Sequence, residues 1–277
     1  MPDLGSIFRP RSVAVIGASR SPDKVGHILV RNLLQAGYPG RIYPVNPNAE
    51  DLLQLKCYSR VEEIPDDIDL AVIAIPSQLV LQEAEACGKK GVKSIIVVSA
   101  GFKETGVEGA VLEKELVRIC RQHGMSLQGP NCLGVINTHI PLNLSFAAAM
   151  PKKGSIGFVS QSGALGTAVL DWVLKEDIGF GCFVSLGNKA DLDEIDFIAE
   201  MARDPLIRVI LVYVESIERG QVFVEKAAEV VRTKHLVVLK GGTSSAGARA
   251  AGSHTGAMVG SSTAYETAFR QSGVIVA

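Results

Sequence analysis

The alternation of short apolar runs with longer segments of helical spacing is the feature that most constrains how this chain can fold. The apolar runs of the first half, each a predicted strand, are 12–16, 41–45, 69–75, 94–98 and 125–127. Between them lie segments such as 24–36, whose apolar residues recur every three or four positions. Runs without polar alternation are typical of parallel strands that are covered on both faces. We therefore predict an α/β fold built on a doubly wound parallel sheet with right-handed crossovers.

This alternation of apolar runs and helical segments is interrupted once and then resumes. Residues 137–153 contain two prolines and the small-residue run 147–149, so we expect an inter-domain linker there. The strands predicted after it are 155–160, 181–186, 209–214, 235–239 and 273–276. The sequence thus predicts a Rossmann-like first domain at 1–136 and a second parallel α/β domain at 154–277. Because the chain stops directly after an expected strand, we also expect a longer parent protein, with the second domain truncated at its C-terminus.

Composition and charge argue against several classes of protein. Hydrophobic residues make up 47% of the chain and charged residues 21%, which predicts a well-buried core rather than disorder. A net charge of −1 and an aromatic content of 5% argue against a nucleic-acid partner. The five cysteines are widely spaced and show no metal-ligand spacing, which favours a reducing cytoplasm and predicts no metal site. No apolar run reaches the roughly 18 residues of a membrane span, so we expect no membrane partner.

A glycine-rich loop at 241–257 contains a single imidazole, that of His254. It lies between an apolar run at 236–239 and helical spacing at 258–271, where a helix N-terminus offers free N–H groups to an anion. One interpretation is a flexible linker with an incidental histidine, and the other is a histidine that acts as a nucleophile toward phosphorus. Glu215, at the carboxyl end of a predicted strand, could accept a hydrogen bond from the imidazole or could simply stabilise a helix N-terminus.

The turn after the first strand, at 17–23, occupies the position where a dinucleotide or coenzyme A places its pyrophosphate in such folds. The dinucleotide fingerprint is absent, because the next glycine after Gly17 is Gly26. The second strand ends in Val45-Asn46-Pro47-Asn48, so the carboxylate that binds the ribose of NAD is also missing. NAD is therefore disfavoured, and an ordinary tight turn remains the alternative to a coenzyme site.

Three further turns follow predicted strands, the first two at the same carboxyl edge and the third at a strand-to-helix turn of the second domain. They are 99–103, 128–134 and 160–166. The turn at 160–166 resembles a nucleophile elbow only loosely, because Ser160 replaces the first glycine. The serine hydroxyls and backbone N–H groups of this turn instead favour a phosphate-binding site. Cys132, in the middle turn, is expected to lie near a ligand without a catalytic role, since a lone cysteine is more often a packing residue.

Together these segments resemble the α-subunit half of the NDP-forming acyl-CoA synthetases, which include succinyl-CoA synthetase and ADP-forming acetyl-CoA synthetase. The resemblance is carried by the combination of Gly129-Pro130-Asn131-Cys132, Ser160–Gly163 and Gly252–Ala257, and it covers nearly the whole chain. It implies a CoA-binding Rossmann-like domain followed by a flavodoxin-like domain. It also implies that His254 is the phosphohistidine of the reaction and that Glu215 orients its ring.

The resemblance further implies which residues contact the ligands. The implied CoA contacts are Gly17, Ser19, Arg20, Ser21, Val45, Asn46, Pro47, Pro76, Val98, Ser99, Ala100, Asn131 and Cys132. The implied phosphate contacts are Ser162, Gly163 and Ala164. Succinyl enzymes carry a tyrosine where this chain has 165–168, and a glycine- and lysine-rich run where it has 46–50. Both departures favour acetate or another small acyl acid over succinate.

The implied reaction interconverts acyl-CoA, ADP and phosphate with acid, CoA and ATP, through an acyl phosphate and a phosphohistidine. No segment of the sequence resembles an ATP-grasp nucleotide site, so ATP or ADP and Mg²⁺ are expected on a β-type subunit or a fused domain, in an oligomer. Two alternatives stay open. One is a CoA-binding regulatory module of a multidomain protein, such as a fused acyltransferase, and the other is an NAD-dependent enzyme.

Overall fold

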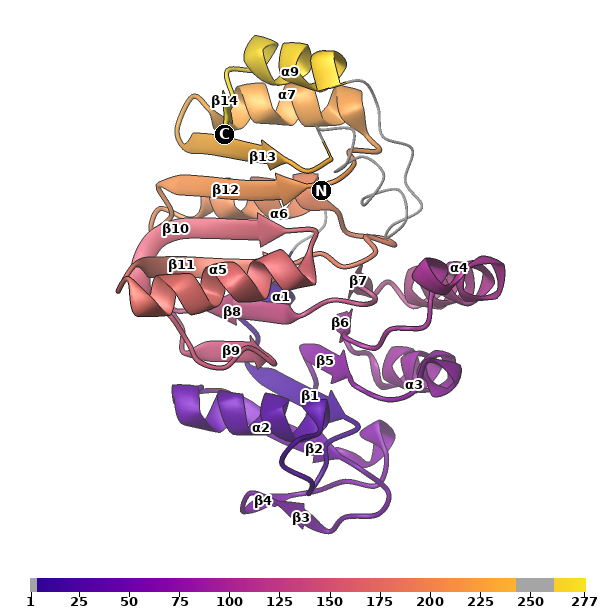
Figure 1. Ribbon diagram of the computed structural model, residues 1–277. Helices are drawn as coiled ribbons and strands as arrows, with labels where there is room; N and C mark the ends of the chain where they lie inside the picture. The colour runs from indigo at the N-terminus through magenta and orange to yellow at the C-terminus, as the bar shows by residue number, and fades with distance from the viewer. Residues whose placement is uncertain (1–3, 243–261) are drawn as a thin grey trace.

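The computed structural model describes residues 4–242 and 262–277, and two β-sheets dominate it (Figure 1). The first sheet has five parallel strands in the order β2-β1-β5-β6-β7. Their bounds are Ser12–Ile16 (β1), Arg41–Val45 (β2), Leu70–Ile73 (β5), Ser94–Val97 (β6) and Ser126–Gln128 (β7). Each strand overlaps a predicted one, and the predicted parallel α/β fold is confirmed.

Helices cover both faces of the first sheet. Helix α2 (Val25–Ala36) packs on one face, and α3 (Ser77–Lys90) and α4 (Val107–Gln122) pack on the other. Helix α2 ends at Gly37, whose left-handed conformation (φ 73°) favours glycine. The short elements are α1 (Gly5–Phe8), β3 (Asp51–Leu52), β4 (Leu55–Lys56) and the 3₁₀ turns η1 (Val61–Glu63) and η2 (Lys103–Thr105).

The second sheet has seven strands in the order β14-β13-β12-β10-β11-β8-β9. Its parallel strands are β10 (Lys152–Ser160), β11 (Gly179–Ser185), β12 (Val209–Val214), β13 (His235–Lys240) and β14 (Ile275–Val276). The helices of this domain are α5 (Gly163–Lys175), α6 (Glu194–Arg203), α7 (Gly220–Val230) and α9 (Ser262–Gln271). One apolar cluster contains residues of both domains, including Phe8 and Phe197, whose ring centres lie 5.9 Å apart. The two domains therefore share a core.

The segment between the domains differs from our expectation. Instead of a linker over 137–153, the chain forms an antiparallel hairpin of β8 (Gly134–Asn137) and β9 (Leu142–Ser145), and β8 pairs with β11. Both strands are buried, because α2 of the first domain packs against β9. The hairpin thus extends the second sheet and joins the domains. The prolines and small residues around these short apolar runs concealed them in the sequence.

Each sheet has one point where the strand order reverses, and ligands in such folds bind outside the carboxyl ends of the strands at that point. In the first sheet the reversal lies between β1 and β5, so the turns at Gly17 and Pro76 flank it. In the second sheet it lies between β10 and β12, so the turns at Ser162 and Glu215 flank it. The topology therefore places all four of these predicted site residues at the edges where ligands bind in such folds.

Gly26, the second residue of α2, lets this helix approach the turn at Gly17. A Cβ atom at Gly26 would lie 1.9 Å from the carbonyl oxygen of Gly17. We expect Gly26→Ala to lower the free energy of unfolding by about 1–3 kcal/mol, because the helix or the turn must move. Urea unfolding followed by circular dichroism measures this loss.

The matched control is Gly220→Ala at the start of α7. A Cβ atom there would meet no described atom within 4 Å, so we expect unchanged or slightly higher stability, since alanine favours a helix over glycine. Equal losses in the two variants would contradict the packing argument.

Candidate functional site

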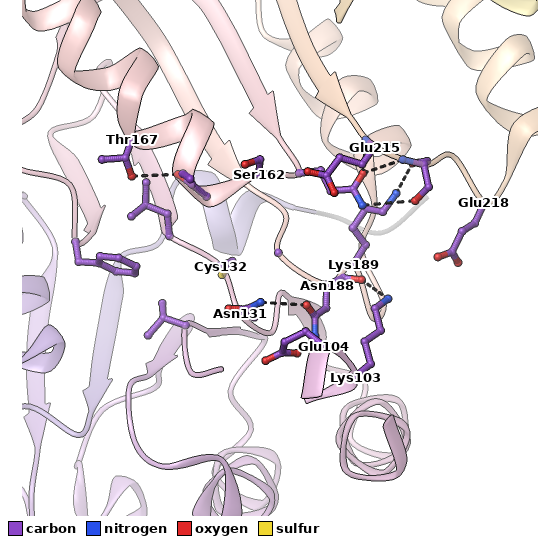
Figure 2. A pocket seen from close by; sticks show the side chains of 18 residues that line it. Lys103, Glu104, Asn131, Cys132, Ser162, Thr167, Asn188, Lys189, Glu215 and Glu218 are labelled. Atoms are coloured by element: carbon purple, nitrogen blue, oxygen red, sulfur yellow. Dashed lines mark hydrogen bonds between the residues drawn. The ribbon is translucent and has the colours of Figure 1, made fainter. Parts of the chain in front are cut away.

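Two cavities open at the carboxyl edges of the two sheets and adjoin each other between the domains. The first, of about 580 Å³, lies against the turns of the first sheet. The second, of about 570 Å³, is bounded by residues of both domains (Figure 2). Val98 and Phe146 line both cavities. The candidate site therefore runs from the Gly17 turn to the Ser162 turn.

Backbone hydrogen bonds fix the Gly17 turn at the end of β1. Gly17 has φ 88°, and its N–H donates to the carbonyl oxygen of Val45 at 3.0 Å. The side chain of Asn46 donates to the carbonyl oxygen of Ala18 at 2.6 Å. A Cβ atom at Gly17 would lie 2.5 Å from the carbonyl oxygen of Ala74, so glycine is required by both the conformation and the space. The turn is thus shaped before a ligand binds, as a preorganised anion site requires.

The residues predicted to contact CoA divide into three groups. Those that line the first cavity are Gly17, Ser19, Asn46, Pro76, Val98, Ser99 and Ala100. Asn131 and Cys132 line the second cavity. The described linings do not include Arg20, Ser21, Val45 or Pro47. Val45 is buried in β2, and the Arg20 side chain donates to the carbonyl oxygen of Asp51.

The second cavity contains the start of α5, which is arranged to receive an anion. Ser162 caps this helix, and its hydroxyl accepts a hydrogen bond from the N–H of Leu165 at 3.2 Å. The first N–H groups of a helix have no acceptor within the helix, and the first turn of α5 contains no acidic residue. Gly163 and Ala164 line the cavity beside Ser162. The helix dipole and the free N–H groups therefore favour a phosphate here.

Glu215 follows β12 and lines the same cavity (Figure 2). Gln161 fixes its backbone, because the Gln161 side-chain oxygen accepts from the N–H of Glu215 at 2.8 Å and from that of Ser216 at 3.2 Å. Lys189 also holds this segment, since its Nζ donates to the carbonyl oxygen of Ser216 at 2.7 Å. These bonds hold Glu215 in a defined place at the same strand edge as the Ser162 turn.

Lys189 also belongs to a buried ion pair. Its side chain is 2% exposed and that of Glu194 is 0% exposed, with Nζ and Oε2 3.0 Å apart. Burial raises the pKa of Glu194, and the charge of Lys189 opposes this rise. Because Glu194 is the first residue of α6, the pair ties that helix to the loop that follows β12.

A second buried ammonium, that of Lys240, lies at the end of β13. Its side chain donates to the carbonyl oxygen of Gly241, and Nζ lies 4.8 Å from the centre of the Tyr265 ring in α9. Burial lowers the pKa of Lys240, whereas the negative charge of Glu215 raises it. Lys240 therefore contacts the start of the glycine-rich loop and α9, and its charge interacts with that of Glu215.

A side-chain network joins the two domains beside the second cavity (Figure 2). The amide of Asn188 donates to Glu104 at 2.6 Å and to Glu113 at 2.7 Å. Lys103 donates to the carbonyl oxygen of Asn188, and its Nζ lies 3.6 Å from Glu113. Burial raises the pKa of Glu113, and the hydrogen bond from Asn188 opposes this rise. The network fixes the carboxyl edges of the two sheets relative to each other.

Cys132 lines the second cavity, but its thiol bonds to the protein. Its Sγ donates to the carbonyl oxygen of Val97 at 3.4 Å. Burial raises the pKa of this thiol to about 12, so it stays protonated at neutral pH. A buried, protonated thiol is a poor nucleophile, in keeping with the packing role expected from the sequence.

The cavities also contain residues that the sequence analysis did not assign to the site. In the first cavity these are Ala18, Lys24, Val25, Gly26, Ala74, Ile75 and Phe146. In the second they are Lys103, Glu104, Leu133, Phe146, Gln161, Thr167, Gly187, Asn188, Lys189, Ser216 and Glu218. Several belong to strand-end turns, so the rule that ligands bind at carboxyl edges could have found them. Phe146 carried no such signal, because only the tertiary structure brings the end of β9 to this edge.

His254 and the loop residues 243–257 lie outside the described residues, so the placement of His254 near Glu215 stays a prediction. Over residues 4–242 and 262–277, no group of three or more His, Cys, Asp or Glu side chains is arranged to hold a metal ion. In the same ranges no helix is long and apolar enough to cross a membrane.

Two family models match the chain, one for each domain. The model described as a CoA binding domain matches residues 11–138. The model described as a succinyl-CoA ligase like flavodoxin domain matches residues 153–277. These matches confirm the predicted order of a Rossmann-like CoA-binding domain followed by a flavodoxin-like domain.

Relatives match nearly the whole chain. It is 50% identical to the ADP-forming acetate–CoA ligase I of Archaeoglobus fulgidus, over 98% of this chain and 39% of the relative. It is 47% identical to the alpha subunit of ADP-forming acetate–CoA ligase II of Pyrococcus furiosus, over 99% of this chain and 60% of the relative. A solved dinucleotide-forming acetyl-coenzyme A synthetase of Ca. Korarchaeum cryptofilum, in complex with phosphate and ADP, is 45% identical. It superposes with a TM-score of 0.97, over 100% of this chain and 60% of that one. The chain thus spans less than two thirds of the length of these relatives.

Proposed function

The chain belongs to the NDP-forming acyl-CoA synthetases, and we propose that it is the α-type portion of one of them. The proposed reaction interconverts acyl-CoA, ADP and phosphate with acid, CoA and ATP. A phosphate oxygen attacks the thioester carbon, the carbon–sulfur bond breaks, and CoA leaves as a thiolate that takes up a proton. The phosphoryl group of the resulting acyl phosphate then passes to a histidine, releasing the acid, and from the histidine to ADP.

The adjacency of the two cavities at the strand-order reversals carries this proposal. Transfer of the acyl group requires the CoA sulfur and a phosphate oxygen within reach of one carbonyl carbon. The Gly17 turn is suited to the CoA pyrophosphate, and the Ser162 turn at the start of α5 is suited to phosphate. Because Val98 and Phe146 line both cavities, ligands on the two turns can meet between them.

The proposed roles follow from this arrangement. The CoA-contacting residues are those of the first cavity lining together with Asn131 and Cys132, and phosphate binds at Ser162, Gly163 and Ala164. His254 carries the phosphoryl group. Glu215 accepts a hydrogen bond from Nδ1–H of the imidazole, which leaves Nε2 as the nucleophile.

We further propose that ATP or ADP and Mg²⁺ bind on a β-type subunit or a fused ATP-grasp domain, in an oligomer. The greater length of the relatives supports this, as does the alpha-subunit name of the Pyrococcus relative. Acetate is the proposed acid, because it is the acid in the names of these relatives. A cytoplasmic location agrees with five free, buried cysteines.

The two alternatives account for fewer features of the site. A regulatory CoA-binding module does not require an anion-binding site at Ser162, nor a glutamate fixed beside it at the carboxyl edge of the second sheet. An NAD-dependent enzyme requires an acidic residue at the end of the second strand, where this chain has Asn46. The ligase proposal assigns a ligand to each cavity, CoA to the first and phosphate to the second.

CoA is expected to stabilise the chain, whereas NADH at the same concentration is not. At a ligand concentration of 100 times Kd, selective binding to the folded state raises the free energy of unfolding by about 2.7 kcal/mol. Thermal unfolding with each ligand measures the difference. Asn46→Ala should weaken the CoA effect, because it removes the bond to Ala18, while Asn48→Ala, an exposed control, should not. Stabilisation by NADH without stabilisation by CoA would overturn the proposal.

A further inference from the structure

Phe146 stands where the two cavities adjoin. It follows β9, it is 38% exposed, and it lines both the first and the second cavity. The other residue common to both linings is Val98, which follows β6 in the first domain. An aromatic and an aliphatic side chain, one from each sheet, therefore form an apolar wall at the junction.

The backbone on both sides of Phe146 is held in place. The buried amide of Asn32, in α2, donates to the carbonyl oxygen of Ser145 at 2.8 Å and to that of Ala147 at 3.0 Å. The N–H of Phe146 itself donates to the carbonyl oxygen of Leu133 at 3.4 Å. The backbone from which the Phe146 side chain projects therefore has a defined position at the junction.

The chemistry of acyl transfer places the acyl group at this junction. In the thioester the acyl carbon is bonded to the CoA sulfur, and in the acyl phosphate it is bonded to a phosphate oxygen. The group must therefore lie between a ligand on the Gly17 turn and one on the Ser162 turn. We propose that Phe146 contacts the acyl group and limits its size, so that this chain accepts short, uncharged monocarboxylic acyl groups. This inference rests on the proposed function.

The charges of the second cavity support the restriction to uncharged acyl groups. Three carboxylates line it, those of Glu104, Glu215 and Glu218. The two lysines among its described lining residues, Lys103 and Lys189, are already bonded to Glu113, Glu194 and backbone carbonyl oxygens. A second carboxylate on an acyl group in this cavity would therefore meet like charges, and among the described lining residues of this cavity no lysine is left to pair with it.

The test measures binding of CoA, acetyl-CoA, isobutyryl-CoA and phenylacetyl-CoA to the full chain by calorimetry. In the unaltered chain, acetyl-CoA should bind about as tightly as CoA, and the two larger thioesters should bind at least about tenfold more weakly, as apolar pockets discriminate by size. Phe146→Ala should improve the binding of the larger thioesters relative to CoA by about tenfold. Phe146→Leu should give a smaller change in the same direction and keeps the test valid should the alanine variant unfold.

Trp172→Ala is the matched control, because Trp172 is 54% exposed on α5 and is absent from the described cavity linings. It should leave every ratio unchanged. If the unaltered chain binds CoA but the ratios do not change in the Phe146 variants, this inference is overturned and the proposed function stands. If the unaltered chain binds neither CoA nor its thioesters, the proposed function fails and this inference fails with it.

Discussion

His254→Ala is expected to abolish the transfer of labelled phosphate from ATP to this chain. The assay mixes the full chain with an ATP-grasp β-type partner, ATP and Mg²⁺, and detects phosphate that is labile to acid and stable to base. Since the histidine would be the covalent carrier, its removal should leave no label above that of a control without this chain. Glu215→Gln should slow labelling without abolishing it, because the imidazole remains but loses its orienting charge.

His235→Ala is the control for this experiment. His235 is exposed at the amino end of β13, the opposite end of the strand from the glycine-rich loop, so labelling should persist. Label that survives His254→Ala would contradict the assignment of the phosphoryl carrier. No label on the unaltered chain, combined with tight CoA binding, would instead favour a CoA-binding regulatory module.

Lys189→Met is expected to lower the free energy of unfolding by about 3–5 kcal/mol, the typical loss when one partner of a buried ion pair is removed. The variant leaves Glu194 fully buried without its cation and removes the bond to the carbonyl oxygen of Ser216. Urea unfolding at neutral pH measures the loss. Lys152→Met is the control, because Lys152 and Asp177 form an exposed pair, for which about 1 kcal/mol or less is expected.

The loss of unfolding free energy in Lys189→Met should be larger at neutral pH than at acidic pH. Burial raises the pKa of Glu194, and the Lys189→Met variant lacks the positive charge that opposes this rise. The folded state then binds a proton at pH values where the unfolded state has released it. Stability therefore falls as pH rises above the ordinary carboxyl pKa and recovers as pH is lowered toward it. A loss that is equal at all pH values, or no greater than that of Lys152→Met, would show that the pair does not act as argued.

The sequence predicted the strands well because their signal is local. The run at 12–16, for example, is apolar throughout, and β1 is indeed buried on both faces. The hairpin of β8 and β9 was missed because its strands are short and their burial comes from α2 and β11, which are distant in sequence. Among the site residues, Gly17 and Ser162 could be recognised from their positions after predicted strands. Phe146 could not, and neither could the hydrogen-bond partners of Asn188, since these lie on other elements.

The sequence by itself determined the parallel α/β fold, the family resemblance and the candidate roles of His254 and Glu215, because periodicity and short motifs are properties of neighbouring residues. Only the tertiary structure decided that the strand-order reversals of the two sheets adjoin. It alone decided that Lys189 and Gln161 fix the segment after β12 and that Phe146 stands between the cavities. These features depend on contacts between residues that are far apart in the chain. Such contacts are set by how the two sheets pack against each other, and no local sequence pattern specifies them.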